Sequence, residues 1–282
     1  PGMIQASWDR ALSHKNLKLV FCGSSVGMME QTFLLPSSPL FGRRPGQLRL
    51  GPLRPGHLAD LFPTWQPVDL VELAALFGGV PGYLVRLDPD LSLAENIERH
   101  LLTAGEPLYE EVPFLLREEL REPRVYQAIL AAIAGGASKF GELSSKVGLD
   151  RANLSRYLSI LVELGLVRRE VPVTERRPEK SRKGLYRIGD PFVATWYTFV
   201  HPLKDRIERG QTRQSMSERV VPHLPRYLGF AVEPVWRDLL LSTRGSELVP
   251  FEARTAGRYW SSTAELDVVM LDDDMSHAFV CE

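Results

Sequence analysis

The feature that most constrains the fold of this chain is a succession of three short apolar repeats between residues 124 and 165, each closed by glycine. In the first two repeats the apolar side chains recur three or four positions apart: Val125, Ile129 and Ile133, then Phe140, Leu143 and Val147. That spacing places each set on one face of a helix, so two helices are predicted. Gly135-Gly136 should end the first helix. Ser138 is the expected N-cap of the second helix, and Gly148 is its expected left-handed C-cap.

A third helix should follow Asp150, whose carboxylate can accept hydrogen bonds from the free N–H groups of the first turn. Its apolar stripe consists of Leu154, Leu158 and Leu161. The opposite face then carries only polar side chains, which are Arg151, Asn153, Ser155, Arg156 and Ser159. This polar face is predicted to be exposed to solvent.

A basic hairpin is predicted after the third helix. Gly165 ends the helix, Leu166-Val167 begins a strand, and residues 185–188 return as a second strand. Between residues 168 and 187, three glutamates are outnumbered by eight cations: Arg168, Arg169, Arg176, Arg177, Lys180, Arg182, Lys183 and Arg187. Three helices followed by such a hairpin is the order of a winged helix-turn-helix, whose third helix can enter the major groove of DNA.

Double-stranded DNA is therefore the predicted partner, because a local excess of cations suits phosphate contact. The predicted contacts are Arg151, Asn153, Arg156, Arg176, Arg177, Lys180, Arg182 and Lys183. In the alternative interpretation, the basic loop is a solvated hairpin tip and the three helices form a module for protein contacts. Both interpretations keep the same fold.

The bulk composition is that of an ordinary globular chain. The 282 residues carry a net charge of -1 and are 44% hydrophobic, which suits about two or three domains and excludes a chain-wide polycation. Cys22 and Cys281 form no C-x-x-C site, and the six histidines show no metal-ligand spacing. No apolar run reaches membrane-spanning length, so we expect no membrane segment and a cytoplasmic location.

The amino-terminal part reads as the end of a parallel α/β sheet. A helix is predicted over residues 3–13, and the apolar run Leu17–Cys22 predicts a buried parallel strand. Gln47–Leu50 is the only further candidate strand here, so the chain is expected to open inside a domain whose earlier strands lie outside it. Residues 23–27 match the G-x-S-x-G elbow of hydrolases around Ser25. A small-residue turn is the preferred interpretation, because the downstream sequence becomes helical.

Four segments together resemble a known family: Leu19–Ser25, Pro39–Arg44, Gln47–Leu50 and Gly78–Leu84. They resemble the archaeal-type AAA+ ATPases, which also occur in bacteria and carry a C-terminal nuclease-like domain. The resemblance implies that Ser24 belongs to a polar sensor turn, that Arg43 contacts a nucleotide phosphate, and that residues 57–120 form a helical lid. Helices are expected there from Val68 to Gly78, from Leu91 to Leu102, and from Tyr109 to Leu120.

The chain departs from that family in lacking a G-x-x-x-x-G-K-[ST] loop and an acidic strand ahead of the serine turn. ATP is therefore expected only in a complete molecule that includes an N-terminal ATPase half, and these 282 residues are predicted to be inactive as an ATPase. The resemblance is compatible with an oligomer.

The carboxyl-terminal part carries acidic residues in a strand pattern. Leu266, Val268 and Met270 alternate with Glu265 and Asp267, so the two carboxylates are predicted to share one strand face and the apolar side chains the other. A helix over residues 230–241 carries Glu233, and Glu282 follows the acidic turn at residues 272–274. This arrangement resembles the PD-(D/E)XK nucleases up to the lysine, which would lie two positions beyond Glu282. The resemblance implies catalytic roles for Glu233, Asp267 and Glu282, with weak magnesium binding at Asp267 and Glu282.

The predicted fold class is mostly α with α/β remnants. Four domains are expected: the end of an AAA+ ATPase core at 1–56, a helical lid at 57–120, a winged helix-turn-helix at 121–200, and a truncated PD-(D/E)XK nuclease-like domain at 201–282. The predicted function is the C-terminal portion of a DNA-associated ATPase. Two alternatives remain open: a winged-helix transcriptional regulator, or a protein-interaction ATPase whose nuclease-like domain is inactive.

Overall fold

The computed structural model describes residues 2–23, 29, 32–33, 35–42, 46–48, 50–242 and 247–281. Its contacts divide the chain into two compact units, namely Pro1–Gly51 with Glu118–Arg121, and Pro52–Arg117 with Glu122–Glu282. All the strands that the structure describes belong to the second unit. The described part is mostly helical, as predicted, with small antiparallel sheets.

The first unit begins with the predicted helix, which comprises α1 (Gly2–Ser7) and the π-helical turn η1 (Trp8–Leu12). The parallel strand predicted at Leu17–Cys22 is wrong, because this segment is unpaired as a strand and Val20 exposes 81% of its surface. Gln47–Leu50 is likewise not a strand where it is described. A parallel strand needs neighbouring strands for its backbone N–H and C=O groups. The described sheets contain only strands from residue 167 onward, so they supply no such neighbour.

The second unit begins with a helical region: α3 (Pro55–Leu61), α4 (Pro67–Phe77), α5 (Pro81–Leu84), α6 (Leu93–Asn96), η3 (Ile97–Leu101) and α7 (Pro107–Glu119). The three helices predicted within residues 57–120 are confirmed by α4, by α6 with η3, and by α7. Ser92 caps α6 as predicted. Its Oγ accepts the N–H of Glu95, whose carboxylate in turn accepts the N–H of Ser92.

The winged helix-turn-helix has the predicted element order: α8 (Pro123–Ala134), α9 (Phe140–Val147), α10 (Arg151–Glu163), β1 (Val167–Glu170) and β2 (Leu185–Ile188). The two strands pair antiparallel. Gly148 has φ 72°, the left-handed conformation predicted for the C-cap of α9. The N-cap of α9 is Lys139 instead of Ser138. The reason is that the Ser138 carbonyl accepts the N–H of Tyr186 in β2, which keeps Ser138 outside the helix.

An aromatic helix follows the wing, made of α11 (Pro191–Thr195) and the π-helical turn η5 (Trp196–Val200). The Phe192 ring lies 4.4 Å from that of Tyr83 and 6.2 Å from that of Phe77, measured between centroids. The indole N–H of Trp196 donates to the Tyr109 carbonyl at 2.8 Å. This helix therefore packs against the helical region before the winged helix.

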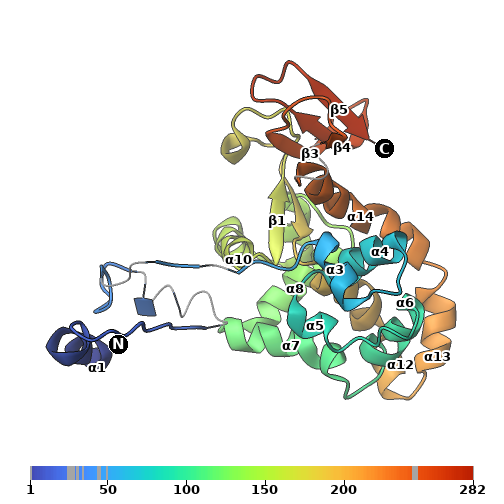
Figure 1. Ribbon diagram of the computed structural model, residues 1–282. Coiled ribbons are helices and arrows are strands. Elements are labelled where there is room, and N and C mark those ends of the chain that lie inside the picture. Colours follow the sequence, from blue (N-terminus) through green and yellow to red (C-terminus); the bar gives the residue numbers. More distant parts are fainter. Residues whose placement is uncertain are drawn as a thin grey trace. The chain divides into compact units, whose positions relative to one another are not determined.

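The chain continues through η6 (His201–Leu203), α12 (Lys204–Glu208), α13 (Thr212–Ser215), the π-helical turn η7 (Met216–Val220) and α14 (Leu224–Leu241). Helix α14 passes through Pro234 without interruption, as predicted, and lies alongside α4 in Figure 1. Among the described helices, none has both the length and the apolar character needed to cross a lipid bilayer.

The carboxyl-terminal sheet contains β3 (Thr255–Trp260), β4 (Glu265–Leu271) and β5 (Ala278–Cys281) in that order, all antiparallel (Figure 1). Strand β3 was not predicted. Val268 and Met270 of β4 pack with Leu240 of α14. On the other face, Val269 and Leu271 pack with Val173 of the wing. The sheet therefore has α14 on one face and the wing on the other.

A β-bulge in β4 changes the predicted side-chain alternation. Gly257 pairs with Val269 but Tyr259 pairs with Leu266, so two residues of β4, Asp267 and Val268, lie opposite Arg258. The bulge resets the alternation of the strand. Leu266 packs on the wing face with Val269, whereas Val268 faces α14, so the prediction that Leu266, Val268 and Met270 share one face is wrong.

Candidate nucleic-acid interface

Helix α10 presents the face that a recognition helix needs. Asp150 caps it, because its Oδ1 accepts the N–H of Asn153 at 2.9 Å. The predicted stripe is buried: Leu154, Leu158 and Leu161, together with Tyr157. The predicted polar face is exposed over its whole length, namely Arg151, Asn153, Ser155, Arg156 and Ser159. Because the apolar face of α10 is buried, its polar face points to solvent.

Two of the predicted contact residues on α10 are held by neighbouring side chains. The Asn153 amide donates to Asp150 Oδ2 at 2.7 Å. The guanidinium of Arg156 lies 4.9 Å from the centroid of the Tyr157 ring and donates to its hydroxyl at 3.2 Å. The Tyr157 hydroxyl donates in turn to the Glu122 carboxylate. Tyr157 therefore positions the guanidinium of Arg156, whereas Arg151 has no carboxylate at ion-pair distance within the described ranges.

The wing carries its predicted cations at its tip, next to the 3-10 turn η4 (Pro178–Lys180). Four of them are exposed and have no carboxylate at ion-pair distance in the part of the chain that the structure describes: Arg176, Arg177, Lys180 and Arg182. Lys183 differs, because its Nζ lies 2.7 Å from the Glu175 carboxylate. Arg169 donates to the carbonyls of Pro178 and Ser181 and so holds the tip in shape.

The root of the wing is an ion cluster centred on Glu170 of β1. Its carboxylate lies 2.9 Å from Arg168, 3.0 Å from Arg187 and 3.4 Å from Arg237 of α14. Burial alone would raise the pKa of Glu170, but the guanidiniums of Arg168, Arg237 and Arg187 outweigh it and hold the pKa below its ordinary value. Arg168 and Arg187, which count as wing cations in the sequence, are therefore engaged in ion pairs within the protein.

The wing also docks on the carboxyl-terminal sheet. The Val173 N–H donates to the Arg258 carbonyl of β3 at 2.8 Å, and the Val173 side chain packs on Val269 and Leu271. Gly257 of β3 lies next to Val173. A Cβ atom at Gly257 would come within 3.1 Å of Val173 Cβ. Glycine therefore permits the close approach of the wing to β3.

Two of the carboxylates predicted as a nuclease-like site, Glu233 and Asp267, converge on an arginine that sequence reasoning missed. The Nε of Arg258 lies 3.2 Å from Glu233 Oε2, and its Nη2 lies 3.6 Å from Asp267 Oδ1 and contacts Glu265. The prediction that Glu265 and Asp267 share a face is thereby confirmed. Burial raises the pKa of Glu233, and Arg258 only partly opposes this effect. No sequence signal marked Arg258, because its partners lie on α14 and β4.

Several predicted site residues lie outside the described residues: Ser24 and Arg43 for nucleotide, Ser25 of the elbow pattern, and Glu282 for metal. Their roles stay predictions, as do the catalytic roles of Glu233 and Asp267. Among the described residues, no group of three or more His, Cys, Asp or Glu side chains is placed to hold a metal ion.

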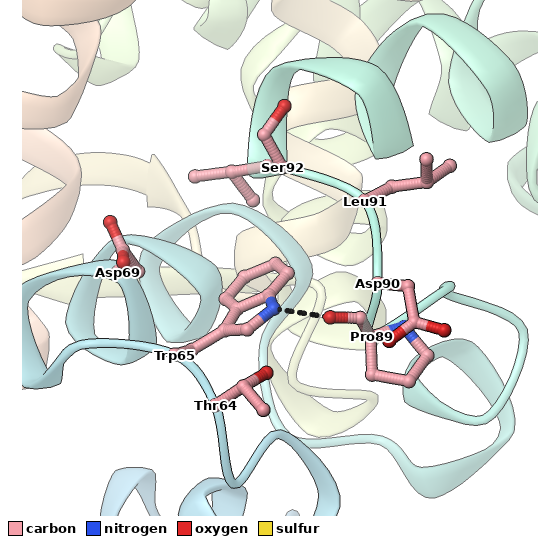
Figure 2. Close-up of a pocket in the computed structure, with 8 residues that line it drawn as sticks. Thr64, Trp65, Asp69, Pro89, Asp90, Leu91 and Ser92 are labelled. Atoms are coloured by element: carbon pink, nitrogen blue, oxygen red, sulfur yellow. Dashed lines mark hydrogen bonds between the residues drawn. The ribbon is translucent and has the colours of Figure 1, made fainter.

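A pocket of ≈ 270 Å³ lies beside Trp65 in the helical region (Figure 2). The indole N–H of Trp65 donates to the Pro89 carbonyl at 2.9 Å, and Asp69 accepts the N–H of Gln66 at 3.2 Å. Ser92 caps α6. Trp65, Asp69 and Ser92 are therefore engaged in hydrogen bonds within the helical region.

Two segments of the chain match protein families. Residues 128–169 match the family described as bacterial regulatory protein, arsR family, and this segment runs from within α8 to β1. Residues 196–282 match a family described as archaea bacterial proteins of unknown function, which spans the chain from η5 through the carboxyl-terminal sheet.

The chain is also similar to parts of two longer proteins. An uncharacterized protein of Methanocaldococcus jannaschii is 32% identical over 281 residues, an alignment that covers 100% of this chain and 62% of the relative. The chain thus spans less than two thirds of that relative's length. A Walker-type ATPase of Pyrococcus abyssi matches with 22% identity and a TM-score of 0.45, over 70% of this chain and 56% of that chain. The comparisons therefore relate residues 128–169 to arsR-type regulators and residues 196–282 to a family of archaeal and bacterial proteins of unknown function.

Proposed function

We propose that this chain binds double-stranded DNA, with α10 in the major groove and the wing tip on the phosphate backbone. The observation that carries the proposal is the exposed polar face of α10 in the same winged helix as four exposed wing cations without described ion-pair partners. The match of residues 128–169 to a regulator family supports it.

The distribution of charge supports phosphate contact specifically at the wing tip. Arg168 and Arg187 at the wing root pair with Glu170, so they hold the hairpin in place and are engaged within the protein. The cations at the tip, Arg176, Arg177, Lys180 and Arg182, remain available. Each cation that neutralises a phosphate releases a counterion, so four such contacts give a salt slope of about -3.6 in a plot of log affinity against log salt.

The α10 face supplies groups that can read bases. Arginine can donate two hydrogen bonds to guanine, and asparagine can pair with adenine. Arg151 is free to do so, whereas Asn153 must exchange its bond to Asp150 for a bond to a base. We infer that Arg151 contributes more to affinity than Asn153 does.

We further propose that the chain acts within a larger, DNA-associated ATPase. Support comes from the resemblance of four segments to archaeal-type AAA+ ATPases and from the greater length of the M. jannaschii relative. ATP would bind to the complete molecule. In this setting the winged helix brings the ATPase to DNA, and the ATPase regulates that attachment.

Fluorescence anisotropy with labelled duplex DNA across a salt series tests the binding proposal. The wild-type chain should bind with an affinity that falls as salt rises, and Arg151→Glu with Arg156→Glu should weaken binding by at least tenfold, roughly 1.4 kcal/mol. Arg213→Glu on α13 is the matched control, since it reverses an exposed arginine outside the winged helix. Equal effects of the double variant and the control would support the protein-contact alternative instead.

A further inference from the structure

Arg258 lies beside Glu233 and Asp267, two of the carboxylates that the nuclease resemblance assigns to catalysis, and beside Glu265. The Arg258 side chain extends from the face of β3 that packs on α14, and only 5% of it is exposed. Glu233 comes from α14, and Glu265 and Asp267 come from β4. Three separate carboxylates therefore share a single buried guanidinium.

The bulge in β4 produces this convergence. Because Asp267 and Val268 both lie opposite Arg258, the carboxylate of Asp267 is brought to the α14 side of the sheet beside the guanidinium. Counted back from Val269 on the wing face, regular alternation would place Asp267 on the wing face too, away from the guanidinium. The bulge therefore places Asp267 within reach of Arg258.

These described residues do not fit a divalent metal ion. A magnesium site needs carboxylate oxygens directed at the ion, whereas Glu233 and Asp267 direct theirs at Arg258. Arginine is a permanent cation in proteins. A metal ion entering here would leave a buried guanidinium without counter-charge, which is strongly unfavourable.

We propose that Arg258 is the resident cation of this cluster and pairs with Glu233, Glu265 and Asp267 in place of a divalent metal. The cluster then holds β3, β4 and α14 together through ion pairs. Its position suits that role, because the carbonyl of Arg258 also accepts the N–H of Val173 in the wing. One turn along α14 from Glu233, Arg237 pairs with Glu170 at the wing root. The cluster therefore stabilises β3 and α14, the two elements that the wing contacts.

The test uses Mn²⁺ as the probe on the full chain, with isothermal titration calorimetry and thermal melting. The wild-type chain should give no saturable heat, and its Tm should match that in KCl of equal ionic strength. Arg258→Met should melt at a lower temperature. Because this change frees the carboxylates, Mn²⁺ should raise the Tm of that variant.

Two further variants keep the result interpretable. Arg258→Lys retains a cation and should not respond to Mn²⁺. The double variant Glu233→Gln with Arg258→Met removes a carboxylate together with its counter-charge, so it should melt above Arg258→Met and respond less to the ion. Saturable Mn²⁺ binding by the wild-type chain that Asp267→Asn abolishes would overturn the proposal. That titration requires only wild-type protein and the isosteric Asp267→Asn variant. It therefore tests the proposal even if Arg258→Met does not fold.

Discussion

Glu170 of β1 and Arg237 of α14 form an ion pair, with the carboxylate Oε1 3.4 Å from the guanidinium Nη2, although 67 residues separate them in the chain. Both side chains are largely buried, with exposed fractions of 12% and 11%. The pair ties the root of the wing to the helix that covers the carboxyl-terminal sheet. Wing position and carboxyl-terminal packing are therefore expected to change together.

Replacement of Glu170 by Gln should destabilise the fold. The change removes the counter-charge of three guanidiniums, and loss of one partner from a buried ion cluster costs about 3–5 kcal/mol. Urea denaturation followed by circular dichroism measures this loss. The control is Glu218→Gln, which breaks a more exposed pair with Arg206 and should cost about 0–1 kcal/mol. Equal losses for the two variants would show that the Glu170 cluster contributes no more than a surface pair.

The Glu170 cluster should also give the stability of the protein a distinct acid dependence. The pKa of Glu170 is lowered from 4.5, since its arginine partners outweigh the effect of burial. A lowered folded pKa contributes stability that is fully present above the unfolded value and is lost as the pH falls through the folded value. The difference in unfolding free energy between wild type and Glu170→Gln should therefore shrink below about pH 4.5. A difference that grows on acidification would contradict the assignment.

Helix α10 depends on its N-cap. Asp150→Ala removes the acceptor for the Asn153 N–H and should cost about 1 kcal/mol of stability. Asp150→Asn keeps an acceptor oxygen at the same place and should retain most of the stability. Urea midpoints of the two variants measure the contrast. A similar loss in both would mean that the carboxylate charge, and not the capping bond, stabilises the helix.

Adjacent wing residues should differ in their contribution to DNA binding. Arg182 is exposed without a described carboxylate partner, whereas Lys183 pairs with Glu175 at 2.7 Å. Arg182→Gln should reduce the salt slope of duplex binding by about one. Lys183→Gln should change it less, because Glu175 already neutralises the ammonium group. The reverse order would indicate that DNA displaces Glu175 from Lys183.

The winged helix could be predicted because its information is local. The apolar spacing of Leu154, Leu158 and Leu161, the cap at Asp150 and the left-handed Gly148 each act within a few residues of the helix that they define. The exposed face of α10 followed directly from that periodicity. Local pattern also indicated β4 and the continuous helix through Pro234.

Long-range features could not be predicted in the same way. The strand expected at Leu17–Cys22 needs pairing partners that no local pattern provides. Strand β3 was missed, and with it Arg258, whose side chain contacts two other elements. The bulge opposite Arg258 changes which face Leu266 occupies, and only the pairing with β3 determines it. Arg168 and Arg187 count as wing cations in the sequence, although both form ion pairs with Glu170 in the structure.

The most direct test of the central claim is the duplex DNA affinity of a chain in which Arg176, Arg177, Lys180 and Arg182 are all changed to Glu. These side chains are exposed at the wing tip, outside the Glu170 cluster, so the fold should persist and can be verified by circular dichroism. If the wing contacts phosphates, anisotropy at low salt should show binding by the wild type and none by the variant. An unchanged affinity in a folded variant would contradict DNA binding through the wing.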